Sequence, residues 1–214
     1  FVIFCFIVTL ICIIISAGIS CLWKDKSIRG EFIQASYRSS AALLGIAFIQ
    51  NIYGNAGMAP VMIIGSVPLY NIMAVVVLSF FKPGQSKIDK EVLKKTLKGI
   101  ITNPIIIGIV VGLLWSACVF HFPDPGEDGD KYWKYATPMG LMAMGGALHF
   151  GKAFSRLKAT IACTFLKLIG FVAVFLPVAI RLGFTHDKLV SILIMLGSAT
   201  TVSCYIMAKN MGHE

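Results

Sequence analysis

Charged residues are scarce in this 214-residue sequence, at 14% against about 25% in an average soluble domain. The scarcity is sharpest for carboxylates: all ten lie outside the long apolar runs. A paired-aspartate intramembrane protease needs two Asp at membrane depth, and a carboxylate-based proton or sodium relay needs at least one. Both classes are therefore excluded. The ten carboxylates are Asp25, Glu31, Asp89, Glu91, Asp124, Glu127, Asp128, Asp130, Asp187 and Glu214.

The sequence also lacks the spacings of a metal or nucleophilic site. Its four histidines are scattered with no pair four residues apart, and its six cysteines form no closely spaced pair. No nucleophile can be assigned a neighbouring base. We therefore expect no cofactor, no metal and no enzymatic activity.

Long apolar runs are abundant instead. Apolar side chains make up 57% of the chain and fall in blocks of about twenty, the length at which a helix crosses a hydrocarbon layer. This pattern predicts an all-α integral membrane protein with about seven spans. They are expected at residues 1–23, 38–53, 59–81, 100–120, 136–151, 161–182 and 189–208.

A polar segment divides the chain into two halves. Residues 82–99 carry several Lys between apolar residues at helical spacing, which predicts an amphipathic linker lying on the cytoplasmic membrane face. The halves are then 1–81 and 100–214. The chain starts directly in an apolar run and stops just after another, so we expect it to be a fragment with spans missing on both sides.

The basic residues are distributed unevenly between the two membrane faces. Fourteen Lys and Arg fall on one face, including Arg38, and four on the other. The basic face is expected in the cytoplasm. This orientation places residue 1 outside the plasma (inner) membrane and loops 24–37, 82–98 and 152–160 in the cytoplasm. It also accounts for most of the net charge of +9 without nucleic acid as a partner.

Two spans of opposite direction, 38–53 and 189–208, hold most of the neutral polar groups at membrane depth. Gly45 and Gly197 would let these helices approach closely or unwind, and unwound half-helices present free N–H groups to an anion. Alternatively, the Ser and Thr hydroxyls bond to carbonyls of their own helices. Lys167, the one ionisable residue well inside a predicted span, would hold a substrate carboxylate or a helix C-terminus, or else extend to the interface.

Five stretches resemble the auxin efflux carrier family of membrane transporters: RSSAALLGIAFIQNIYGNAG, SVPLYNIMAVVVLSFF, LKGIITNPIIIGIVVGLL, TPMGLMAMGGALHFG and LGSATTVSCYIMAKNMG. The resemblance implies ten helices in two inverted repeats, similar to bile acid/sodium symporters, of which this chain would hold the third to the ninth. In the family the fourth and ninth helices are broken, commonly around a proline, and cross at the substrate site. Ala47 and Ala199 stand where that proline is expected, so the breaks would depend on Gly45, Gly197 and the Ser/Thr cluster.

The sequence thus predicts a secondary transporter of small organic anions such as carboxylates, working in a lipid bilayer. It is compatible with either a monomer or a homodimer. The alternative is a non-transporting membrane sensor or scaffold on the same helices. The expected substrate-binding residues are Ser40, Gly45, Gln50, Asn51, Lys167, Gly197, Ser198, Thr200, Thr201 and Ser203.

Overall fold

The computed structural model describes residues 1–81 except Lys24, residues 156–212, and isolated residues between 94 and 146. Within these residues the structure is helical and contains no strand, which confirms the all-α prediction. The predicted linker at 82–99 and the spans at 100–120 and 136–151 fall where only isolated residues are described. These predictions, and the division into halves that depends on them, lie outside the described residues.

Three stretches form uninterrupted apolar helices. They are α1 (Val2–Ser20), α4 (Ala59–Phe80), and a continuous run of α9 (Leu157–Phe165), the π-helical turn η2 (Leu166–Phe171) and α10 (Val172–Arg181). At 1.5 Å per residue, the 22 residues of α4 extend about 33 Å, enough to cross the hydrocarbon core. The spans predicted at 1–23, 59–81 and 161–182 are confirmed as membrane-competent helices.

Two further stretches are interrupted helices. In the first, α2 (Lys26–Tyr37) is separated by residues 38–40 from the π-helical turn η1 (Ala41–Gly45), which continues into α3 (Ile46–Tyr53). In the second, α11 (His186–Gly197) is separated by residues 198–201 from α12 (Val202–Asn210). The second stretch confirms the span predicted at 189–208 and shows where it breaks.

The prediction that residues 24–37 form a loop is wrong. Residues 26–37 form α2, which packs against α1 and α4 as the first half of an interrupted helix. One side of α2 is buried, including Phe32 and Ile33, whereas Arg29 and Glu31 remain partly exposed. These charges lower the average hydropathy of the segment, so the segment does not stand out as an apolar run. Its apolar side becomes visible only when residues are compared at helical spacing.

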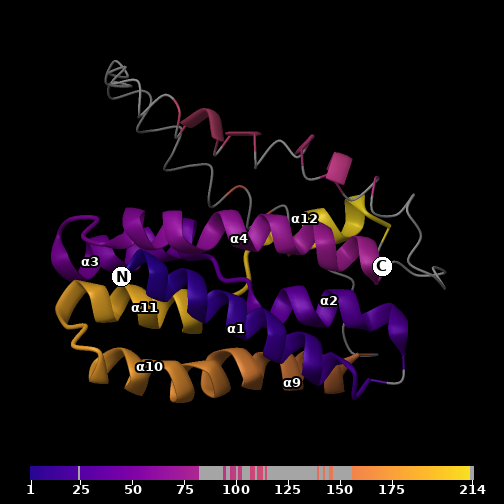
Figure 1. The fold of residues 1–214 in the computed structure, drawn as a ribbon, viewed down its shortest axis with the longest axis horizontal. Coiled ribbons are helices and arrows are strands. Elements are labelled where there is room, and N and C mark those ends of the chain that lie inside the picture. Colours follow the sequence, from indigo (N-terminus) through magenta and orange to yellow (C-terminus); the bar gives the residue numbers. More distant parts are fainter. Residues whose placement is uncertain are drawn as a thin grey trace.

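The described helices stack in layers. In Figure 1, α3 and α4 lie on one side, α9 and α10 lie on the other, and α1, α2 and α11 run between them. A large hydrophobic core joins these layers, with Ile33, Met62, Phe171 and Ile192 among its buried members. A smaller cluster joins α4 to α12 and consists of Ala74, Val75, Leu78 and Met207. Helices α1 and α4 approach closely at Gly65, where an added Cβ would lie 3.0 Å from the Val2 carbonyl oxygen.

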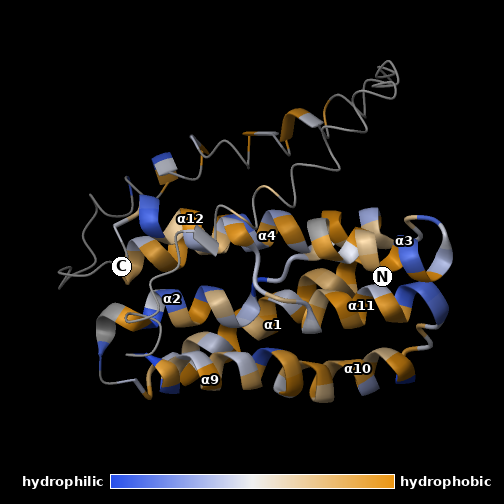
Figure 2. Cartoon of the chain, turned by 180° about the vertical axis from the view of Figure 1, so that it is seen from behind, coloured by the Kyte–Doolittle hydropathy of each residue, from blue (hydrophilic) through white to orange (hydrophobic). Residues whose placement is uncertain are grey.

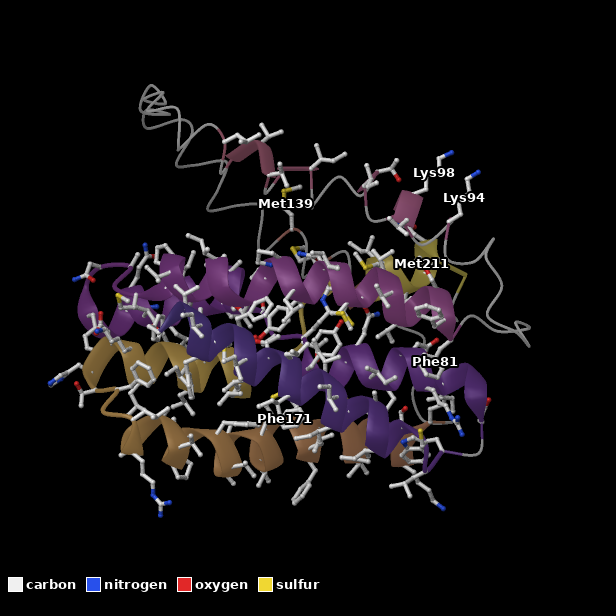
Figure 3. The ribbon with its side chains drawn as sticks, viewed as in Figure 1. Phe81, Lys94, Lys98, Met139, Phe171 and Met211 are labelled. Carbon is white, nitrogen blue, oxygen red and sulfur yellow. The ribbon has the colours of Figure 1, made fainter. Side chains whose placement is uncertain are left out.

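Polar residues gather mainly at the two ends of the bundle and apolar residues predominate between them, as a membrane slab requires (Figure 2). At one end the Phe184 ring contacts Phe1, with ring centroids 5.9 Å apart. At the other end Arg156 lies 4.0 Å from Glu31, and Phe81 and Met211 lie at this same end in Figure 3. The start of the chain and the turn after α10 thus share one face, opposite the turn between α1 and α2.

Candidate functional site

The interruptions of the two broken helices lie side by side in the bundle. The backbone N–H of Ser40 donates a hydrogen bond of 2.8 Å to the carbonyl oxygen of Ala199. Residues 38–40 and 198–201 are called the crossing below. Ser198 has φ −79° and ψ 158°, and Thr201 has φ −72° and ψ 146°, so the chain is extended between α11 and α12. Neither break contains a proline.

Two side chains, one from η2 and one from the second break, hold the C-terminal end of α2. Lys167, from η2, is only 3% exposed and donates a hydrogen bond through Nζ to the carbonyl oxygen of Arg38. Thr200 Oγ1 donates to the Ala35 carbonyl at 3.3 Å. These donors satisfy carbonyls that a helix leaves unpaired at its end. Of the possibilities considered for Lys167, the structure therefore shows the bond to a helix C-terminus, and the side chain is buried.

Both π-helical turns adjoin the crossing. In η1 the Ser40 carbonyl accepts hydrogen bonds from the N–H groups of both Leu44 and Gly45, at 3.0 and 3.1 Å. The turn η2 carries Lys167 as its second residue. A π-helical turn widens a helix locally and is frequent at functional sites. Here one such turn restarts the first broken helix and the other carries Lys167, which binds the end of α2.

Arg38 lies at the crossing and not in the cytoplasm, which corrects its place in the count of basic residues. Its side chain is 2% exposed. The Nη2 group donates to Asn71 Oδ1 at 2.9 Å and to Ser203 Oγ at 3.0 Å. The Nη1 group donates to Gln34 Oε1 at 3.4 Å and to the Met207 sulfur at 3.6 Å. Arg38 thus connects α2, α4 and α12 through neutral acceptors.

Two buried polar atoms at the crossing have no hydrogen-bond partner in the part of the chain that the structure describes. They are Arg38 Nε, from the first break, and Ser198 Oγ, from the second. No ion pair joins Arg38 or Lys167 to a carboxylate among the described residues. Within the described residues, the crossing therefore holds the Arg38 guanidinium without a paired carboxylate.

The structure brings most of the predicted site residues together. Gly197 ends α11 immediately before the second break, and an added Cβ there would lie 3.2 Å from Val172 Cγ2. The Cβ at Gly45 would lie 3.1 Å from Ile194 Cγ2, so both glycines allow close helix packing. The other predicted residues at or beside the crossing are Ser40, Lys167, Ser198, Thr200, Thr201 and Ser203.

Gln50 and Asn51 are placed differently. Both lie on α3, well past the break, and both are exposed in the described structure. Ten or more residues of helix separate them from residue 40, about 15 Å along the axis. The structure therefore does not bring them to the crossing.

Four residues of the crossing network were not predicted: Arg38, Gln34, Asn71 and Met207. Asn71 had a visible signal, since it is the one amide in the apolar run from 59 to 80 and a polar residue inside a span is expensive. It is buried in the middle of α4 and also donates through Nδ2 to the Val67 carbonyl at 3.0 Å. Gln34 donates through Nε2 to the Cys204 carbonyl at 3.0 Å, from a helix that was predicted to be a loop.

Comparisons with known proteins agree with this architecture. A family model described as membrane transport protein matches residues 1–214. Comparison with curated proteins and with solved structures found no match. The described residues contain four helices that are long and apolar enough to cross a membrane, in agreement with that family. The chain therefore belongs to the family of membrane transport proteins of the auxin efflux carrier type.

Proposed function

We propose that this membrane transporter carries small organic anions, such as carboxylates, and binds them at the crossing near the bilayer midplane. The observation that carries the proposal is the direct bond between the two interruptions, from the Ser40 N–H to the Ala199 carbonyl. It joins two broken helices inside the bundle, the arrangement in which transporters expose main-chain groups to a ligand.

The free groups at the crossing favour an anion over a cation. The C-terminal end of α2 is satisfied by Lys167 and Thr200. By contrast, η1 and α12 start at the crossing, and neither Ser40 nor Thr201 makes a side-chain capping bond in the described structure. Uncapped helix N-termini present N–H groups and the positive end of the helix dipole. With Arg38 and Lys167 beside them, these groups make a site for negative charge.

Counterflow in proteoliposomes containing the full-length protein would test transport directly. Vesicles loaded with unlabelled acetate, benzoate or succinate should accumulate the corresponding labelled anion faster than empty vesicles. Gly197→Leu should lower this rate by about tenfold or more, because its side chain would collide with Val172 beside the crossing. Gly18→Leu is the matched control, since nothing lies within 4 Å of an added Cβ on this exposed part of α1.

The result also separates the transporter from its alternative. A parent protein that binds one of these anions but gives no counterflow would favour a non-transporting sensor or scaffold. Equal rates in the parent and Gly197→Leu would remove the crossing from the transport path.

A further inference from the structure

We infer that Arg38 is the charge anchor of the transported anion and takes a carboxylate side-on, through the edge formed by Nε and Nη2. This inference rests on the proposed function and adds the residue, the edge and the ligand chemistry. The first observation is that Arg38 Nε has no hydrogen-bond partner among the described residues, although Arg38 is only 2% exposed.

The guanidinium of arginine is a cation with five N–H donors and no acceptor. Burying such a charge is unfavourable unless an opposite charge or a full set of hydrogen bonds compensates it. The described structure supplies neither: four neutral acceptors bind Nη1 and Nη2, and Nε has none. The sequence places no carboxylate in an apolar run that could serve. We therefore expect an anionic ligand to supply the negative charge that compensates Arg38.

The shape of the open position selects the ligand. Nε and Nη2 of a guanidinium lie side by side in one plane, and their N–H groups match the two oxygens of a carboxylate. At present Nη2 binds Asn71 Oδ1 and Ser203 Oγ, at 2.9 and 3.0 Å. When a carboxylate binds, one of its oxygens replaces a neutral acceptor of Nη2, and its other oxygen accepts the hydrogen bond that Nε can donate. Hydrogen bonds between charged partners are about twice as strong as neutral ones, so the exchange is favourable.

The second unpartnered atom points to the same ligand. Ser198 Oγ is buried in the other break, which is bonded to the first through Ser40 and Ala199. A hydroxyl donates one hydrogen bond and accepts others, so it complements either an oxygen of the carboxylate or a polar group on the remainder of the ligand. Each break therefore contributes one unused polar atom.

Equilibrium binding to the purified full-length protein in nanodiscs would test this assignment, with benzoate as the probe and uncharged benzamide as its isostere. Arg38→Lys keeps the positive charge and removes the paired N–H edge, so benzoate should bind about tenfold or more weakly than to the parent. Arg181→Lys makes the same exchange at an exposed position at the end of α10 and should leave the affinity unchanged. A benzoate affinity in Arg38→Lys within twofold of the parent would overturn the inference.

A second measurement on the parent protein covers the case in which Arg38→Lys does not fold. Phenylglyoxal modifies arginines, and mass spectrometry would report the modified fraction of Arg38. Saturating benzoate should slow modification of Arg38 several-fold, benzamide should not, and Arg181 should react equally in all samples. Equal modification of Arg38 with and without bound benzoate would overturn the assignment of Arg38. Absence of any benzoate, acetate or succinate binding to the parent would instead overturn the proposed function.

Discussion

Lys167 and Arg38 are both buried, yet their surroundings give them different roles. The Lys167 ammonium has a main-chain acceptor, the carbonyl of Arg38, at the end of α2. A cation at a helix C-terminus also complements the negative end of the helix dipole. Lys167 is therefore a positioning residue: it fixes the end of α2, and through it the backbone from which the Arg38 side chain projects.

Replacing Lys167 with Met tests this role, because the substitution keeps much of the side-chain length and removes the donor. The Arg38 carbonyl would be left unsatisfied, at a cost of about 1–3 kcal/mol in the free energy of unfolding. Counterflow should fall by about tenfold, since the crossing loses its geometry. Lys158→Met is the matched control, because Lys158 is exposed on α9. Thermal unfolding and counterflow of both variants would provide the measurements, and unchanged behaviour of Lys167→Met would remove Lys167 from the site.

The sequence singled out Lys167 but not Arg38, and the reason is local context. Lys167 has apolar residues on both sides along the chain, so its depth in the membrane can be read from its neighbours. Arg38 follows a segment containing Lys26, Arg29 and Glu31, so it was assigned to the interface with them. Its burial depends on α2 entering the bundle, which is a result of tertiary packing.

At the scale of elements, the broken helices show that a break can be held by contacts between helices without proline. The first break is bonded to the second by the Ser40 N–H, and its α2 side is held by Lys167. The Ser198 backbone is already in the extended conformation that residues before proline prefer. Ala47, by contrast, lies inside α3, after the helix has restarted.

These positions predict opposite outcomes for two proline substitutions. Ala199→Pro should be tolerated, with a change of at most about 1 kcal/mol in unfolding free energy, because the break already exists. Ala47→Pro should cost about 3 kcal/mol or more, since it removes a helical hydrogen bond and clashes with the preceding turn. Denaturation of both variants in detergent would measure the difference. A strongly destabilised Ala199→Pro alongside a stable Ala47→Pro would place the breaks elsewhere in the two helices.

The helices themselves were predictable to different degrees for a physical reason. The sequence indicated α4 to within a residue, because its apolar run continues around the whole helix. It missed α2 entirely, because that helix buries one side only and mixes charged with apolar residues. The breaks were expected near Gly45 and Gly197, and only the second lies beside its glycine. Where a helix unwinds is decided by partners distant in the chain.

For the whole molecule, the two ends of the bundle differ in basic charge. Among the described residues, one end holds Lys26, Arg29, Lys94, Lys98, Arg156, Lys158 and Lys209, and the other holds Arg181 and Lys188. The excess remains after Arg38 is removed from the count. It favours the first end as cytoplasmic.

Cysteine labelling of intact cells tests this orientation. Native Cys21 is exposed at the more basic end, and Leu182 is exposed at the other. In a background free of other cysteines, Leu182→Cys should react with an impermeant maleimide in intact cells. Cys21 should react only after permeabilisation. Labelling of both from one side would contradict the arrangement of spans, and the reverse order would contradict the orientation.

The bond between Ser40 and Ala199 has an evolutionary consequence, because it joins main-chain atoms only. Any residue at 199 supplies the carbonyl, and any residue except proline at 40 supplies the N–H. Natural selection can therefore exchange side chains around this joint, Ser198 and Ser203 among them, without dismantling it. Related carriers can therefore diverge in substrate while they keep the same hydrogen bond between the two broken helices.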